Sequence, residues 1–204
     1  GRPRLRPLRP MPTRHERRQG ASVTYWIGID PGSRATGVVL RQGSNLLWWT
    51  VVERGTDEGR LGVGPEYIRT VLASVWDAAR VSMYPARVAV EEVTPPSPHV
   101  TYQRKDGSKG YARPRPADLQ ALAAVYGAVL ATFPAAVIVH PSGNGSRPLS
   151  TYPRDLVTDA ERRAKGNPHR AAGHTATVNH ARSAWDVAGQ APLFARLAMR
   201  ELQP

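Results

Sequence analysis

Three carboxylate side chains occupy positions from which they could meet at one edge of a sheet. Asp30 follows an apolar run that begins at Val23, Glu91 follows a shorter run over 87–90, and Asp186 lies in a helical pattern near the end of the chain. An acid at the carboxyl end of a strand projects from the edge where ligands bind in α/β folds. Carboxylates that converge there repel one another unless a cation neutralises them, and oxygen ligands favour Mg²⁺ or Mn²⁺. The pattern therefore predicts a divalent-cation site at Asp30, Glu91 and Asp186.

The chemistry that such a site supports is the hydrolysis of phosphodiester bonds. Two Mg²⁺ ions about 4 Å apart can hold the attacking and leaving oxygens of an in-line displacement. A simpler interpretation takes each acid alone, because Asp30-Pro31-Gly32 is a common turn and a strand-end acid such as Glu91 is often solvated. Asp186 argues against that interpretation, since its neighbours are Ala184, Trp185, Val187 and Ala188. Three acids in this order favour a functional site.

The elements around these acids predict one α/β domain over residues 23–204. Apolar and alternating patterns indicate five strands, at 23–29, 36–41, 46–53, 87–90 and 135–140. Helical periodicity indicates long helices at 65–82, 117–131 and 177–202, and a short charged helix near 153–165. Tight turns between the first three strands predict an antiparallel meander. The expected fold is α/β, a mixed five-stranded sheet flanked by helices.

The charge of the chain indicates a polyanionic partner. It has 28 Lys and Arg against 16 Asp and Glu, a formal net charge of +12. Basic residues that neutralise phosphates gain affinity from the release of counterions. Seven arginines and one glutamate lie in residues 1–22, which we interpret as a disordered basic tail because its prolines exclude a helix. Met11 is an alternative start, so the tail carries no functional argument.

Composition also excludes several classes of protein. The chain has no cysteine, which rules out disulfide scaffolds and thiolate metal sites. Reduced cytoplasm is compatible with this composition, and we expect the protein there. No stretch approaches the ~18 consecutive apolar residues of a membrane span, and the basic N-terminal residues lack the apolar core of a secretory signal.

A basic loop over 94–116 follows Glu91 and is expected to overhang the carboxylates. Its cations alternate with aromatic rings, which is typical of surfaces that contact phosphates and stack on unpaired bases. The simpler interpretation is a solvated, flexible loop. Its position favours DNA contacts by Arg104, Lys105, Lys109, Arg113, Arg115, Tyr102 and Tyr111. Further candidates for the same basic surface are Arg147, Arg154, Arg162 and Arg163.

Three segments resemble the motifs of RuvC-type Holliday junction resolvases of the RNase H-like superfamily, particularly the phage-type members. They are IGIDPGSRATG at 27–37, VAVEEV at 88–93 and HARSAWDVA at 180–188. The resemblance implies an RNase H-like fold, a homodimer, two Mg²⁺ per active site (Mn²⁺ can substitute) and paired symmetric nicks across a four-way DNA junction. It selects Glu91 over Glu92. It also implies that Asp30 bridges both ions while Glu91 and Asp186 each complete one.

Two positions depart from the family's pattern. Resolvases of this type usually carry a second ligand, Asp or His, three residues before the last acid, where this chain has Ser183. The fourth group of the site could then be Ser183 itself, His180 one turn earlier, or Glu92; we include His180 among the candidate catalytic residues. The aromatic wedge that often follows the second acid is also replaced, because Thr94 is followed by two prolines.

Three alternatives compete with a junction resolvase. The first is an RNase H-like nuclease of broader range, which cuts flaps, forks or hybrids. The second, motivated by Ser183, is a branched-DNA-binding protein with impaired catalysis. The third is a sugar-kinase or actin-like ATPase, which also opens on Asp-x-Gly after a strand but needs a second copy of that motif, and none is present.

Overall fold

The computed structural model describes residues 24–55, 64–82, 84–94, 100–103, 109–112, 116–163 and 175–201. A five-stranded sheet in the order β3-β2-β1-β4-β7 forms its centre. β1, β2 and β3 pair antiparallel, whereas β4 and β7 run parallel to β1. The strands are β1 (Tyr25–Asp30), β2 (Ala35–Gln42), β3 (Asn45–Glu53), β4 (Ala86–Glu91) and β7 (Val137–Val139). This sheet confirms the predicted mixed five-stranded sheet with its antiparallel meander.

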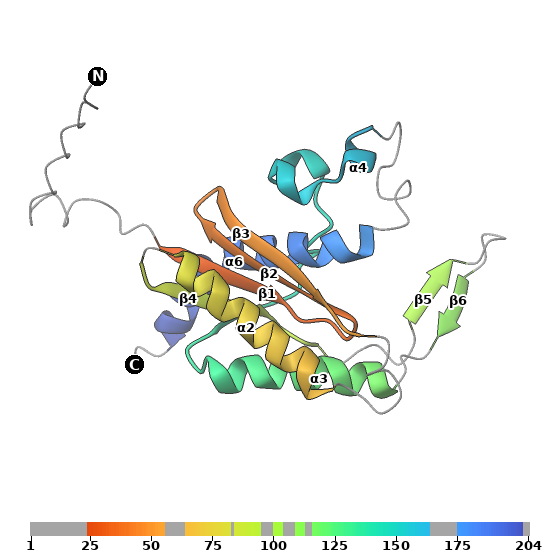
Figure 1. Cartoon of the computed structure of the whole chain (residues 1–204), viewed down its shortest axis with the longest axis horizontal. Coiled ribbons are helices and arrows are strands. Elements are labelled where there is room, and N and C mark those ends of the chain that lie inside the picture. The colour runs from red at the N-terminus through yellow and green to blue at the C-terminus, as the bar shows by residue number, and fades with distance from the viewer. Residues whose placement is uncertain are drawn as a thin grey trace, which may run out of the picture.

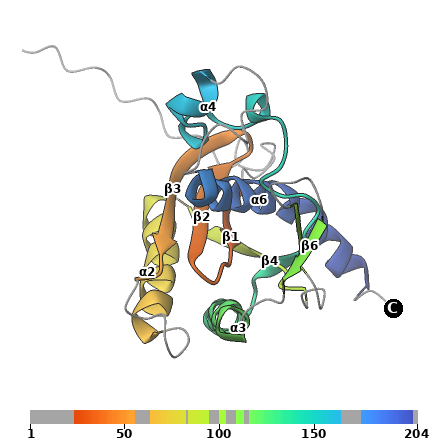
Figure 2. The ribbon, with the colours of Figure 1, turned by 90° about the vertical axis from the view of Figure 1, so that its right-hand side faces the viewer.

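Helices cover both faces of the sheet (Figure 1). α2 (Pro65–Val81) and α3 (Pro116–Thr132) lie on one face and α6 (Thr175–Glu201) on the other (Figure 2). All three begin and end within two residues of the predicted bounds. In the part of the chain that the structure describes, no helix has the length and apolar character needed to cross a membrane.

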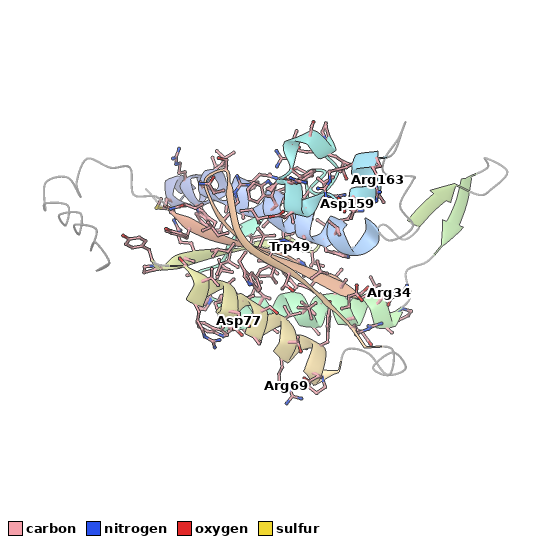
Figure 3. The ribbon with its side chains drawn as sticks, turned by 45° about the horizontal axis from the view of Figure 1, so that its top comes forward. Arg34, Trp49, Arg69, Asp77, Asp159 and Arg163 are labelled. Atoms are coloured by element: carbon pink, nitrogen blue, oxygen red, sulfur yellow. The ribbon has the colours of Figure 1, made fainter. Side chains whose placement is uncertain are left out.

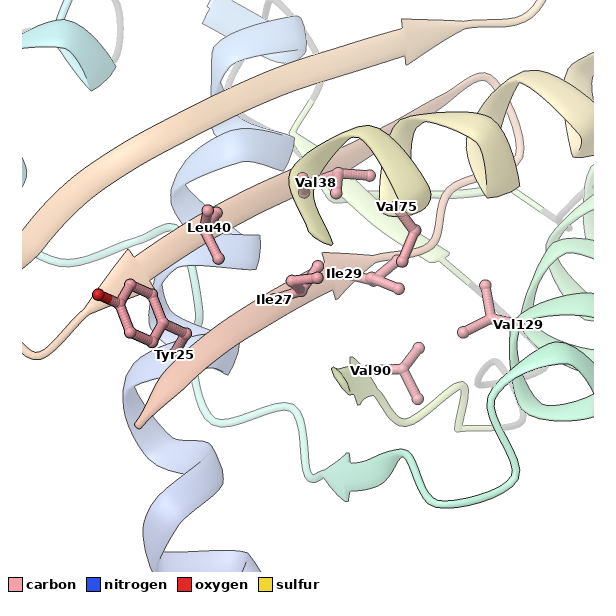
Figure 4. Close-up of a cluster of buried hydrophobic side chains, with 9 residues drawn as sticks. Tyr25, Ile27, Ile29, Val38, Leu40, Val75, Val90 and Val129 are labelled. Atoms are coloured by element: carbon pink, nitrogen blue, oxygen red, sulfur yellow. The ribbon is translucent and has the colours of Figure 1, made fainter. Parts of the chain in front are cut away.

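The alternation of side chains along the strands decides which residues meet which helix. Ile27 and Ile29 of β1 pack with Val75 of α2 and Val129 of α3, in a cluster that also includes Val38 and other residues (Figure 4). The residues of β1 that alternate with Ile27 and Ile29 point toward the opposite face of the sheet. Trp26 packs with Ala188 of α6, and Asp30 shares this orientation because it lies an even number of positions from Trp26. The same parity places Glu91 on the α6 face, since Ala89 of β4 packs there too.

The predicted helix over 153–165 is wrong in its bounds. The structure has two 3-10 turns, η2 (Leu149–Thr151) and η3 (Arg154–Leu156), followed by a short α4 (Asp159–Arg163). A capping box explains why α4 begins so late. Thr158 Oγ1 accepts from the Glu161 backbone N–H at 3.2 Å, and a Glu161 carboxylate oxygen accepts from Thr158 N–H at 2.9 Å. Arg182 of α6, whose side chain is fully buried, pairs with Glu161 and holds this segment on α6.

The predicted loop over 94–116 contains a hairpin. β5 (Val100–Gln103) pairs antiparallel with β6 (Lys109–Ala112) in a separate two-stranded sheet. The sequence carries signals for it that the loop prediction ignored. Val100, Thr101 and Tyr102 favour a strand, and Asp106-Gly107 is a common hairpin turn.

Candidate functional site

Two glycines allow the backbone of α6 to lie directly against the sheet. A Cβ on Gly28 of β1 would lie 2.0 Å from the Ala184 carbonyl oxygen, and one on Gly37 of β2 would lie 2.1 Å from that of His180. Both glycines lie close to Asp30. Gly28 lies two residues before it on β1, and Gly37 is its partner on β2. Glycine at these positions therefore brings the side chains of α6 within reach of Asp30.

We expect Gly37→Ala to destabilise the fold and to weaken the site. The methyl group would collide with backbone rather than with a flexible side chain, so α6 would have to move. Overpacking of this kind costs about 1–3 kcal/mol. Gly127→Ala is the matched control, because a Cβ on Gly127 of α3 meets no atom within 4 Å and should be neutral or stabilising. Urea denaturation of both variants checks this, and equal stabilities would contradict the close approach.

The turn after Asp30 is fixed by α2. Tyr67 donates its hydroxyl hydrogen to the Gly32 carbonyl oxygen at 3.0 Å and shares a 2.8 Å hydrogen bond with Thr36 Oγ1. Thr36 Oγ1 also accepts from Gly32 N–H at 3.3 Å. Tyr67 and Thr36 are both buried, so this network is shielded from water. It fixes the point at which the chain leaves β1 and hence the position of the Asp30 carboxylate.

His180 of α6 contacts Asp30 directly. Its Nδ1 lies 2.7 Å from Asp30 Oδ2, and both side chains are largely buried. Burial alone would lower the pKa of His180, but the hydrogen bond with Asp30 and the charges of Asp30 and Glu91 together raise it above its ordinary value. His180, one of the three candidates for the fourth group, therefore lies at the site.

Glu91 is held from two sides. Asn144 Nδ2 donates to its Oε1 at 2.8 Å, and Ser183 Oγ donates to its Oε2 at 2.9 Å. Burial, together with the hydrogen bond and the charge of Asp30, raises the pKa of Glu91 to about 7, against the opposing effect of these two donors. A buried carboxyl group whose ionisation is opposed by a second acid beside it indicates a place that a cation would stabilise.

Asp30, Glu91 and His180 face one hollow of about 290 Å³. The rest of its lining is polar and consists of Asn144, Gly145, Ser146, Asn179 and Ser183. Among the residues that the structure describes, no three acidic, histidine or cysteine side chains are close enough to enclose an ion by themselves. Mg²⁺ does not need such an enclosure, because it usually keeps several waters and uses one or two carboxylates together with substrate phosphates. The residues present fit a cation of this kind at Asp30 and Glu91.

Asp186 lies beneath the wall of this hollow. Its side chain is 1% exposed and accepts three hydrogen bonds. The donors are Gly145 N–H at 3.0 Å, the Tyr152 hydroxyl at 2.8 Å and the guanidinium of Arg147. The carboxylate thus anchors the loop that carries Asn144 to Glu91. Its role as a metal ligand stays a prediction, since protein donors occupy its oxygens here.

The remaining predicted residues fall outside the hollow or outside the described part of the chain. Glu92 pairs with His140 and does not line the hollow. Arg104, Lys105, Arg113 and Arg115 lie beyond the described residues. Of the others, Tyr102 belongs to β5, and Lys109 and Tyr111 belong to β6; only their backbone is described.

The loop after β7 was missed as part of the site. Asn144 contacts Glu91 and also accepts from Gln190 Nε2 at 2.5 Å, so it joins β4 to α6. Gly143 and Gly145 on either side have φ values of 72° and 76°, a conformation that favours glycine. The signal in the sequence is a polar residue between two glycines, a few residues after a parallel strand.

Comparisons with known proteins give structural neighbours only. No family model matches the sequence, and no curated protein matches it. The chain is similar to the structure described as "T. thermophilus RuvC in complex with Holliday junction substrate", with a TM-score of 0.45 and 19% identity over 86% of this chain and 96% of that one. It is also similar to a second RuvC structure from Thermus thermophilus, with a TM-score of 0.42 and 20% identity over 86% of this chain and 97% of that one.

Proposed function

We propose that this protein is a Mg²⁺-dependent endonuclease that hydrolyses phosphodiester bonds in branched DNA, four-way junctions foremost. The observation that carries the proposal is the meeting of Asp30 and Glu91 in one polar hollow, where burial and the charge of Asp30 oppose the ionisation of Glu91. These acids end neighbouring parallel strands and lie in the first two of the motifs that resemble those of RuvC-type resolvases. The net charge of +12 agrees with a nucleic-acid substrate.

In this proposal Asp30 and Glu91 hold the cation. A bound divalent ion would neutralise charge at the reacting phosphate and supply an activated water. Asn144 and Ser183 orient the Glu91 carboxylate through their hydrogen bonds, and His180 orients Asp30. The resemblance implies a second ion at Asp186, which would require exchange of the donors that Asp186 binds in this structure.

The substrate class rests on the resemblance and on charge. We propose that the basic loop after Glu91 contacts the junction arms and that the protein acts as a homodimer, because paired nicks need two active sites. The test is a panel of labelled four-way junction, fork, flap, duplex and RNA–DNA hybrid with Mg²⁺ or EDTA. Symmetric, Mg²⁺-dependent cuts confined to the junction, made by a species of dimer mass in sedimentation, are expected.

Other outcomes of this panel would select the alternatives. Equal cleavage of forks and flaps would replace the junction resolvase with an RNase H-like nuclease of broader range. Tight junction binding without cleavage in Mg²⁺ or Mn²⁺ would indicate a binding protein with impaired catalysis. A protein that neither binds nor cleaves any of these substrates would refute the proposal as a whole.

Asp186→Asn is expected to separate cation binding from catalysis. Asn keeps acceptor capacity but loses the charge that pairs with Arg147, so the Asn144 loop should loosen and cleavage should fall by roughly 100-fold. Mg²⁺ that binds the folded protein should raise its Tm, and this rise should persist in Asp186→Asn because Asp30 and Glu91 remain. Differential scanning calorimetry with and without Mg²⁺ measures this, with the exposed Asp155→Asn as control. Loss of the Mg²⁺-dependent rise in Asp186→Asn alone would show that Asp186 is needed for the first cation.

A further inference from the structure

A second hollow, of about 370 Å³, lies on the other side of the loop that bears Asn144. Arg41 at the end of β2 and Arg147 of the loop both line it, together with Ser44, Thr151, Tyr152 and Trp185. We refer to it as the arginine cleft. We refer to the hollow lined by Asp30 and Glu91 as the carboxylate hollow. The loop that carries Asn144 and Arg147 forms a wall of both the carboxylate hollow and the arginine cleft.

Arg41 is fixed in place before any ligand arrives. Its Nε donates to the Gly43 carbonyl oxygen at 2.7 Å and its Nη1 to that of Trp185 at 2.9 Å. The guanidinium also lies 3.7 Å from the centre of the Trp185 ring. Gly189 leaves room for it, because a Cβ there would lie 2.4 Å from Arg41 Nη1. These contacts use two of the five N–H groups of Arg41, and their partners, two backbone carbonyls and an indole ring, carry no formal charge.

The two arginines of the cleft repel each other. Burial and then the positive charge of Arg147 lower the pKa of Arg41 to about 10. Arg147 pairs with Asp186, but half of its side chain remains exposed (51%). An anion between the two guanidinium groups would relieve the repulsion, and the planar donors of arginine suit phosphate oxygens.

The cleft lies at a distance from Asp30 that a DNA strand can span. In the β1–β2 pairing Asp30 is opposite Gly37, four residues before Arg41, which at about 3.4 Å per residue is about 14 Å along the strand. DNA rises about 3.4 Å per nucleotide, so roughly four nucleotides cover the same length. Both Asp30 and Arg41 face α6.

We propose that the arginine cleft binds a backbone phosphate of the DNA strand that passes the carboxylate hollow, several nucleotides from the cut. This inference rests on the proposed function and adds a binding site on the body of the domain, separate from the basic loop after Glu91. Because the contact is to phosphate, it contributes affinity and position, and no sequence preference.

Binding of a labelled four-way junction, measured by fluorescence anisotropy in EDTA over a range of salt concentrations, tests the cleft. Arg41→Gln is expected to weaken binding roughly tenfold and to reduce the slope of log K against log salt by about 0.9. Arg69→Gln is the matched control with the same loss of charge. Arg69 lies on α2, its side chain is 69% exposed, and it pairs with Glu66 at 3.1 Å (Figure 3). It should leave both quantities unchanged.

Arg41→Lys separates charge from structure. Lysine keeps the charge but cannot bridge two carbonyls and stack on Trp185 as guanidinium does, so it should retain most of the slope. If Arg41→Lys loses as much slope as Arg41→Gln, or if Arg41→Gln matches Arg69→Gln, the cleft does not bind DNA phosphate. Tight calorimetric binding of inorganic phosphate with no effect of Arg41→Gln on DNA would reassign the cleft to a free anion. Failure of the wild-type protein to bind the junction would instead refute the proposed function.

Discussion

Asp30→Asn is expected to reduce the rate of junction cleavage by about a thousandfold or more, while the protein stays folded and still binds DNA. Asn is isosteric with Asp and can accept from His180, so the contact between α6 and β1 is retained. What disappears is the negative charge that, with Glu91, would attract the cation. A single-turnover assay on a labelled junction measures the loss, and circular dichroism with junction binding in EDTA checks that the rest of the protein is intact.

Asp77→Asn is the matched control for Asp30→Asn. Asp77 lies on α2, on the opposite face of the sheet from α6, and pairs with Arg80 at the surface (Figure 3). Its loss should leave cleavage within about twofold of wild type, since exposed ion pairs contribute little. Unchanged cleavage by Asp30→Asn would remove the central residue of the proposed site and with it the proposed chemistry.

The sheet and the two acids that end its central strands were predictable because their signals are local in the sequence. An apolar run that ends on Asp30, and another that ends on Glu91, indicate two buried strands, and strand parity then places both acids on the same face. The glycines beside Asp30 are also explained by the sequence once a helix is expected on that face. Gly28 and Gly37 are the positions where its backbone approaches.

The partners of these acids were not predictable, because they come from segments distant in the sequence. Asn144 reaches Glu91 from a loop 53 positions away, and Arg147 reaches Asp186 from 39 positions away. Ideal helix geometry places His180 about 120° around the helix from Asp186, at ~100° per residue, so the sequence alone does not bring both side chains to one point. In the structure the two side chains have different partners: His180 contacts Asp30, and Asp186 contacts the loop after β7.

Glu91→Gln is expected to stabilise the protein above pH 7 in EDTA, although it should abolish cleavage. The folded-state pKa of Glu91, about 7, lies above the value of about 4.3 expected for an unfolded chain. Between these values the folded state keeps a proton that the unfolded state releases, so wild-type stability falls as pH rises from about 4.3 to 7. Gln has no such penalty and can keep its contacts with Asn144 and Ser183. With allowance for solvent screening, the gain at pH 8 is on the order of 1–2 kcal/mol and should vanish near pH 4.

The same variant tests the cation. Mg²⁺ that binds only the folded state should raise the Tm of the wild-type protein at pH 8 but not that of Glu91→Gln. Glu92→Gln is the matched control, because Glu92 is the next residue, carries the same charge and contacts His140 outside the hollow. It should show neither the gain in EDTA nor the loss of the Mg²⁺ effect. If Mg²⁺ stabilises wild type and Glu91→Gln equally, the cation binds elsewhere, because Glu91 is the residue whose unfavourable ionisation a cation in this hollow would offset.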